Sequence, residues 1–401
     1  MRICLHTFFE ITNPYIGGTQ TLLIKLAKEL KILGHDAFIV CSSLQPKFII
    51  EGVEIYGVIP HKYKRLLIES YNGIASSQFL KEAIFNNQSL EYAFKELSYY
   101  SHEQYTQFKA DVYHLNSFVA AAFANVERYT FVVSNHENQY EFDGFWGDNA
   151  YAKFSDMVRN KMTKLHMITS IFTASKFYAN DFSKTFGLNV KFIHLGVALN
   201  DMLYSKHIHI NNDTSFNRSD NTIVVLIPSR FNVKQKGQDI ALQACENILN
   251  KYNIEVVFSG VKQSLADELR RFRNKYNYMQ ISNHTHFIAA PDMYEIYDSV
   301  HVVLSPERYC TYGLSISESL AIGIPTVLSN IPTYKEIALG YEHAFFFKKD
   351  NLNDLMYAIC RAIESSKNNN FRYNKASIQF RIDNDIRKTA VAFSNVYASL
   401  F

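Results

Sequence analysis

The sequence predicts an α/β protein of two domains, each with a parallel sheet covered by helices. Three observations support this fold class. The chain has 401 residues, whereas one domain usually has roughly 100–200. Short apolar runs typical of strands alternate with segments of helical spacing in both halves. Between the halves, residues 205–221 are polar and lack either periodicity, so we interpret them as a linker.

In the first half, the clearest helix is expected at 21–34, where Leu22, Leu26 and Leu30 fall on one stripe. Apolar runs predict strands at 3–9, 36–43, 53–59, 110–116, 130–136, 168–177 and 190–196. The segment 62–109 is rich in Tyr, Phe, Gln and Lys, and we expect it to form helices inserted in the first domain.

The second half repeats the alternation. Strands are predicted at 222–230, 254–260, 279–288, 299–306 and 325–330. Helices are predicted from about 238 to 251, from 314 to 321 and near 386–400. Ligands of such sheets bind at the carboxyl ends of the strands, so the segments that follow strands are the candidates for a binding site.

Charge and cysteine content argue against several classes of protein. The chain has 41 basic and 38 acidic residues, and this balance disfavours a nucleic-acid binder. Its five cysteines are scattered without a CxxC pair, so we expect a reducing, cytoplasmic compartment and neither disulfides nor structural zinc. No apolar run approaches the length of a membrane span, so any membrane contact is expected to be peripheral.

The most informative segment is 306–330, PERYCTYGLSISESLAIGIPTVLSN. A strand ends near Pro306, a loop holds Gly313, and a helix begins near Leu314. Amides at a helix N-terminus, together with the helix dipole, suit a diphosphate. Glu318 lies one turn into this helix, where its carboxylate could accept two hydrogen bonds from a ribose diol. An ordinary exposed helical glutamate is the alternative.

Two further segments follow predicted strands. In 228–240, Arg230 and Lys236 are two cations that can neutralise a diphosphate and stabilise a leaving group. In GGTQ (17–20), Gly17 and Gly18 allow close approach of the backbone to a ligand, and Thr19 is a candidate helix cap. Taken alone, each segment is equally compatible with a solvated loop or a tight connection.

In their order, these segments resemble the large family of retaining GT-B glycosyltransferases, the group 1 or family 4 type, which includes bacterial surface polysaccharide transferases. The resemblance covers nearly the whole chain and rests on GGTQ (17–20), DVYHLN (111–116), SNHEN (134–138), TASKF (173–177), IHLGVALN (193–200), SRFNVKQKG (229–237) and CTYGLSISESLAIGIPTV (310–327). It implies two Rossmann-like domains facing across a cleft. We therefore expect an acceptor-binding domain at 1–200, a donor-binding domain at 201–385, and a helix at 386–401 that crosses back.

The resemblance also implies roles for single residues. His136 would face the sugar and its phosphate, and Glu137 and Asn138 would help to bind the acceptor. Glycines 17 and 18, Arg230, Lys236, Gly313, Leu314 and Glu318 would hold the donor, with Arg230 and Lys236 also assisting catalysis.

Cys310 departs from the family pattern, which places a sugar-binding glutamate eight residues before Glu318. A thiol is a poor hydrogen-bond acceptor. The donor sugar is therefore unusual, or Glu307 replaces the missing carboxylate, or activity is weak or lost. Cys310 remains assigned to the donor site, and a small buried filler is the alternative.

The expected function is transfer of a sugar from a nucleoside-diphosphate sugar to a saccharide or lipid-linked saccharide in surface polysaccharide synthesis. The alternative is a catalytically degenerate GT-B protein that binds another transferase. No metal or other cofactor is expected, because Asp383-Asn384-Asp385 precedes a helical stretch and is interpreted as a helix cap. The basic and apolar segment 59–68 is either a peripheral contact with the inner face of the membrane or a solvated helix face.

Overall fold

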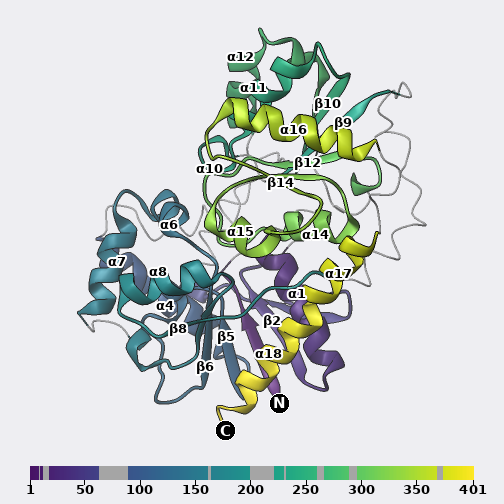
Figure 1. Cartoon of the computed structure of the whole chain (residues 1–401). Helices are drawn as coiled ribbons and strands as arrows, with labels where there is room; N and C mark the ends of the chain where they lie inside the picture. The colour runs from purple at the N-terminus through teal and green to yellow at the C-terminus, as the bar shows by residue number, and fades with distance from the viewer. Residues whose placement is uncertain are drawn as a thin grey trace. The chain divides into compact units, whose positions relative to one another are not determined.

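The computed structural model describes residues 1–8, 10–11, 18–62, 89–160, 164–198, 221–229, 232–259, 266–288, 296–367 and 374–401. These residues divide into two compact units, each with its own sheet (Figure 1). Unit 1 contains the described residues up to Leu195 and Ile386–Phe401, and unit 2 contains the described residues from Gly196 to Asp385. The boundary expected from the sequence is residue 200.

Unit 1 contains an eight-stranded sheet in the order β3-β4-β2-β1-β5-β6-β7-β8. Its strands are β1 (Arg2–His6), β2 (Asp36–Cys41), β3 (Phe48–Ile50), β4 (Val53–Gly57), β5 (Val112–Leu115), β6 (Phe131–Asn135), β7 (Ile171–Thr173) and β8 (Val190–Phe192). All neighbouring pairs are parallel except β3 with β4. The strands are apolar because both faces of the sheet are covered.

The helices of unit 1 pack on two separate cores. They are α1 (Gly18–Ile32), α4 (Leu90–Tyr105), α5 (Phe118–Ala121), α6 (Gln139–Trp146), α7 (Ala150–Arg159), α8 (Lys176–Phe186) and α18 (Ile386–Ala398), with a 3-10 turn, η1 (Lys164–Met167). Alternation along β2 shows the division, since Phe38 and Val40 enter the core with α4 to α8, whereas Ile39 and Cys41 enter the core with α1 and α18.

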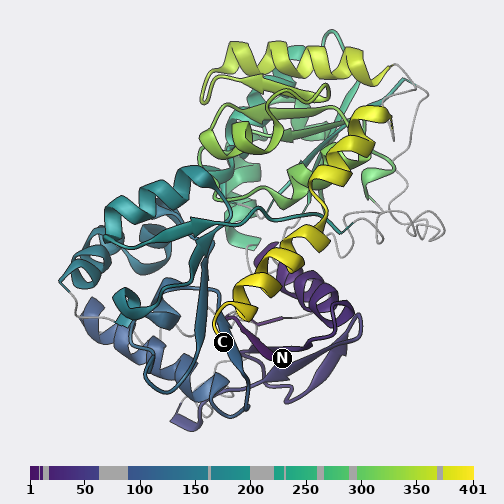
Figure 2. The same ribbon diagram turned by 60° about the horizontal axis from the view of Figure 1, so that its bottom comes forward.

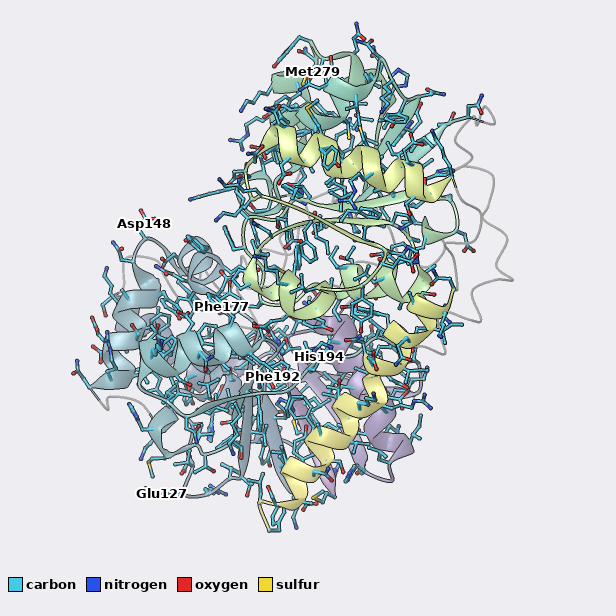
Figure 3. All side chains as sticks on the ribbon, in the orientation of Figure 1. Glu127, Asp148, Phe177, Phe192, His194 and Met279 are labelled. Carbon is cyan, nitrogen blue, oxygen red and sulfur yellow. The ribbon has the colours of Figure 1, made fainter. Side chains whose placement is uncertain are left out.

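Helix α18 is part of unit 1 although it is last in the sequence. It packs beside α1, as both Figure 1 and Figure 2 show. The Thr389 hydroxyl donates to the backbone carbonyl of His194, a residue labelled in Figure 3 (2.9 Å). The buried Tyr397 hydroxyl is 2.7 Å from Nδ1 of His114 on β5. Polar contacts and a shared core therefore both fix this helix.

Unit 2 contains a fully parallel six-stranded sheet in the order β11-β10-β9-β12-β13-β14. Its strands are β9 (Ile223–Pro228), β10 (Ile254–Ser259), β11 (Thr285–Ile288), β12 (Val302–Ser305), β13 (Thr326–Ser329) and β14 (Ala344–Phe347). Its helices are α10 (Val233–Lys236), α11 (Gln238–Ile248), α12 (Ala266–Tyr276), α14 (Leu314–Ile322), α15 (Pro332–Ala338), α16 (Leu352–Ser366) and α17 (Lys375–Asp383), with a 3-10 turn, η5 (Gln280–His284). One core lies under α11, α12 and α16, and the other lies under α14, α15 and α17.

Two expectations about local structure are wrong. The strand predicted at 279–288 begins only at Thr285, because the preceding residues form η5, whose Gln280 and Ile281 amides donate to the Glu246 carboxylate at 3.1 and 2.7 Å. Helix α1 begins at Gly18, so Thr19 lies inside it and does not precede it as a cap. Of the segment Asp383-Asn384-Asp385, interpreted as a helix cap, Asp383 ends α17 and accepts from the Tyr341 hydroxyl, whereas Asp385 directly precedes α18.

Candidate functional site

The strand order of unit 2 defines where a ligand would bind. From β9 the chain continues to β10 and β11 on one side, and then returns to β12, β13 and β14 on the other. The order therefore reverses between β9 and β12, and crevices of open α/β sheets lie at the carboxyl ends of strands at such a point. The strands end there at Pro228 and Ser305, and the Ser315 hydroxyl at the start of α14 donates to the Pro228 carbonyl (3.3 Å).

Lys236 follows β9 and is the last residue of the short helix α10, whereas the sequence suggested an open loop. Asn232 caps this helix by accepting from the Gln235 amide at 3.2 Å. Gly237 ends α10 with a φ of +66°, and a Cβ at this position would lie 2.3 Å from the Pro306 carbonyl oxygen. Only glycine fits both requirements, so the glycine brings α10 against the segment that follows β12.

Within unit 2, the Lys236 ammonium contacts Glu307. The distance between Nζ and Oε1 is 2.8 Å, and the side chains are only 12% and 7% exposed. A charge so far removed from water is retained when it has a partner of opposite charge. Glu307 is therefore neither a solvated residue nor a spare carboxylate, because in this structure it is paired with the predicted phosphate-binding lysine.

Arg308 ties the same two segments together, and sequence reasoning missed it. Its guanidinium donates to the Val233 carbonyl of α10 at 2.7 Å, to both carboxylate oxygens of Asp239 at 3.1 Å, and to Asp350 at 2.7 Å. Its backbone amide donates to the Gln235 carbonyl at 2.9 Å. Arg308 has the fork geometry suited to such multiple contacts. Arg308 lies just before the signature that begins at Cys310, but its contacts are with residues 69 to 75 positions earlier and 42 positions later in the chain, which no local pattern records.

The predicted anion-binding helix begins at Leu314, as expected. Gly313 precedes α14, and its side-chain position is closed by Tyr334, whose Cε1 would be 2.9 Å from an added Cβ. No described side chain forms a cap hydrogen bond at this helix end. Since the first amides of a helix have no partner within the helix, they suit an anion.

Glu318 is the fifth residue of α14 and is half-buried. The hydroxyl of the buried Tyr297 lies 3.1 Å from its Oε2 and 3.0 Å from the Ser315 carbonyl, so one hydroxyl hydrogen is shared between the two acceptors. Tyr297 therefore restricts the orientation of the predicted ribose-binding carboxylate. Its distance from the motif in the sequence explains why sequence reasoning did not include it.

Cys310 is buried, 6% exposed, in the core shared by α14 and α15. Its thiol donates to the Tyr312 carbonyl at 3.0 Å, and its own carbonyl accepts from Thr333 at 2.6 Å. These contacts are those of a packed loop residue. They fit the alternative of a small buried filler.

In unit 1 the strand order reverses between β1 and β5, and His136 follows the neighbouring strand β6. Its Nε2 lies 3.2 Å from Oδ1 of Asn116. Because Nδ2 of Asn116 donates to the His6 carbonyl at 3.1 Å, Oδ1 must face the ring, and Nε2 carries the proton. Burial lowers the pKa of His136 to about 4, so the ring is neutral at neutral pH.

The two predicted acceptor-binding residues differ in their surroundings. Asn138 is buried and caps α6 by accepting from the Glu141 amide at 3.0 Å. Glu137 is half-buried, and its carbonyl accepts from Asn135 at 2.8 Å. The side-chain oxygen of Asn138 is thus committed to the fold, whereas its Nδ2 is buried and makes no hydrogen bond within the described residues.

The remaining predicted positions are Gly17, Gly18, Arg230 and the basic segment 59–68. Gly17 and Arg230 lie outside the described residues, and Gly18 is exposed at the start of α1. Of the segment 59–68 only 59–62 is described, and there Lys62 pairs with Glu96 at 2.6 Å. Within the ranges that the structure describes, no group of three or more His, Cys, Asp or Glu could hold a metal ion. No helix in the described part of the chain is long and apolar enough to cross a membrane.

Comparisons with known proteins bear on the family and the fold. Residues 210–378 match the family model described as glycosyl transferases group 1. An uncharacterized glycosyltransferase of Methanocaldococcus jannaschii, MJ1607, is 22% identical over 380 residues, covering 90% of this chain and 89% of that protein. The O-antigen biosynthesis glycosyltransferase WclY of Escherichia coli is 29% identical over 211 residues, covering 52% of this chain and 55% of that protein.

Among solved structures, Anabaena Alr3699/HepE in complex with UDP and glucose superimposes with a TM-score of 0.66 at 15% identity and covers 100% of both chains. The predicted fold class, two Rossmann-like α/β domains of the GT-B type, is confirmed. The match to the group 1 family model and the GT-B fold together support the interpretation of this chain as a GT-B glycosyltransferase.

Proposed function

We propose that this chain transfers a sugar from a nucleoside-diphosphate sugar to a saccharide or lipid-linked saccharide acceptor, with retention of the anomeric configuration. The observation that carries the proposal is the grouping of Lys236, the start of α14 and Glu318 after strands β9 and β12, between which the strand order reverses. A cation, unpartnered helix amides and a carboxylate match the three parts of a nucleoside diphosphate.

In the proposed mechanism, Glu318, oriented by Tyr297, binds the ribose hydroxyls. Lys236, Arg230, Gly313 and the first amides of α14 bind the diphosphate. Gly17 and Gly18 are assigned to the donor on the family resemblance alone. Negative charge that develops on the leaving diphosphate is then met by fixed cations, so no metal or other cofactor is required. His136 takes part as a neutral hydrogen-bonding group, because burial holds its pKa near 4.

The proposed setting is bacterial surface polysaccharide synthesis. WclY, which is similar to half of this chain, is described by its name as an O-antigen biosynthesis enzyme. We accordingly propose a cytoplasmic protein that meets its acceptor at the inner face of the membrane, with Glu137 as an acceptor contact. Contact with the membrane through residues 59–68 is part of this proposal.

The first experiment is a thermal-shift screen with UDP-, GDP-, ADP-, CDP- and dTDP-sugars, followed by an assay for release of the nucleoside diphosphate. We expect one donor to raise the melting temperature and to be turned over slowly in water and faster with acceptor. Binding without turnover in the presence of acceptor extracts would favour the alternative of a degenerate binding partner, which the poor acceptor Cys310 keeps open. If no donor binds, the proposed function is wrong.

The second experiment tests the residues. Glu318→Gln should abolish transfer while it preserves the melting temperature, because the side chain keeps its shape and loses only its charge. In Lys236→Met alone an unpaired Glu307 carboxylate would remain buried and would cost about 3–5 kcal/mol, so a loss of turnover in that variant would mix instability with the loss of the ligand contact. Lys236→Met is therefore combined with Glu307→Gln. The matched control is Glu364→Gln, which removes an exposed ion pair with Lys367 in the same unit. Full turnover in both site variants would refute the assignment.

A further inference from the structure

We infer that Glu307 is a positioning residue for the proposed reaction, and that it holds the Lys236 ammonium in place for the diphosphate of the donor. The inference rests on the proposed function. The carboxylate and the ammonium are 2.8 Å apart, and both side chains are nearly excluded from water. A lysine on a solvated loop would have to lose the freedom of four side-chain bonds when the ligand binds, whereas this lysine is already ordered.

Both partners are anchored through their backbones. Ser329 of β13 donates to the Glu307 carbonyl at 2.5 Å, which ties the carboxylate-bearing residue to the sheet. Gly237 lies directly against Pro306, and Arg308 donates to the Val233 carbonyl of α10. The segments that carry the two charges are therefore clamped together on both sides of the ion pair. The position of Lys236 is set by the segment after β12 as much as by its own helix.

The pair also determines the charge of the lysine. Burial disfavours an ammonium without a counter-charge, and a neutral amine would attract a diphosphate weakly. Glu307 supplies the counter-charge while the site is empty. Its own negative charge repels the incoming diphosphate, but that charge is largely compensated by the paired ammonium 2.8 Å away. Positioning and retention of the positive charge therefore outweigh the repulsion, and removal of Glu307 weakens binding.

This role differs from replacement of the carboxylate that is absent at Cys310. A sugar-binding carboxylate would affect discrimination between donor sugars, whereas a residue that acts through Lys236 affects the diphosphate common to all donors. Glu307 is thus expected to matter equally for a nucleoside diphosphate without any sugar. That expectation allows the two roles to be separated with simple ligands.

The test measures binding of one nucleoside diphosphate, whichever of UDP, GDP, ADP, CDP and dTDP binds wild type best, and of its nucleoside by titration calorimetry. Glu307→Gln should weaken the diphosphate at least tenfold and leave the nucleoside within twofold, which also verifies the fold. Glu307→Asp keeps the charge on a shorter arm and should recover part of the loss. The control Glu364→Gln should bind like wild type.

A double-mutant cycle with Lys236→Met completes the test. Because Glu307 acts through Lys236, the double variant should bind the diphosphate no more weakly than Lys236→Met alone. If the losses add, Glu307 acts independently and the inference is wrong. Equal or tighter diphosphate binding by Glu307→Gln would also overturn it. Failure of wild type to bind any of these diphosphates would instead refute the proposed function itself.

Discussion

Gly237→Ala tests whether the close packing of α10 against the segment after β12 sets the position of Lys236. The φ of +66° at this residue is unfavourable for alanine, and the added Cβ would lie 2.3 Å from the Pro306 carbonyl oxygen. Backbone oxygen cannot rotate away as a flexible side chain can. The substitution must therefore move α10, which carries Lys236, away from Glu307.

The loss in free energy of unfolding that Gly237→Ala causes has two parts, one from the backbone and one from packing. The left-handed backbone conformation costs about 1–2 kcal/mol for a residue with a Cβ. Reduced freedom of the unfolded chain offsets about 0.4–1 kcal/mol of that. Forced movement in a packed contact adds about 1–3 kcal/mol. At roughly 2–4 °C per kcal/mol for a unit of this size, the packing part alone lowers the melting temperature of unit 2 by about 2–12 °C.

Gly340→Ala is the matched control, because Gly340 also lies in unit 2, has a φ of +90°, and an added Cβ would meet no described atom within 4 Å. It carries the backbone strain without the clash. Calorimetric melting and nucleoside-diphosphate titration of both variants give the comparison. We expect Gly237→Ala to melt at a lower temperature than Gly340→Ala. Only Gly237→Ala should also bind the nucleoside diphosphate more weakly than wild type. Equal melting temperatures and equal affinities in the two variants would refute the reasoning.

Three further predictions concern single contacts. Tyr297→Phe removes the hydroxyl at Glu318 and should weaken nucleoside binding about 2- to 12-fold, from a net hydrogen-bond contribution of about 0.5–1.5 kcal/mol; unchanged titration would contradict this. Cys310→Ala removes a thiol that contacts the Tyr312 carbonyl, so it should cost stability of about 1 kcal/mol in urea unfolding yet leave donor affinity within twofold; a larger affinity loss would place Cys310 at the donor. Burial lowers the pKa of His114 from 6.5 to about 3, so the unfolded chain binds more protons below pH 6.5 and stability falls as pH decreases toward 3. His114→Gln should flatten the decline in urea midpoint between pH 6.5 and 4, and an unchanged slope would count against it.

Local pattern was sufficient for most secondary structure. Helix α14 was expected from 314 to 321 and extends from Leu314 to Ile322, because a glycine precedes it and another follows it. Strands at 36–43 and 254–260 were expected from runs of apolar residues. The first range contains β2 and the second contains β10. The pattern did not predict β14 at Ala344–Phe347, a short edge strand whose apolar run of four has no clear period.

The resemblance identified candidate donor residues but not how they are held. Lys236 and Glu318 were named from motifs, whereas Tyr297 and Arg308 became evident only from their contacts. Tyr297 precedes its partner by 21 residues, and Arg308 contacts Val233 at a separation of 75 residues. No local periodicity records which distant side chains will meet.

The sequence by itself determined the α/β alternation, the glycines at sharp backbone positions, and the residue types able to bind a nucleoside diphosphate, because these depend on local propensity and on short spacing. Only the tertiary structure decided that Glu307 is the partner of Lys236 and that Arg308 contacts Val233. Those outcomes depend on strand order, which brings the ends of β9 and β12 together although 77 residues separate Pro228 from Ser305 along the chain.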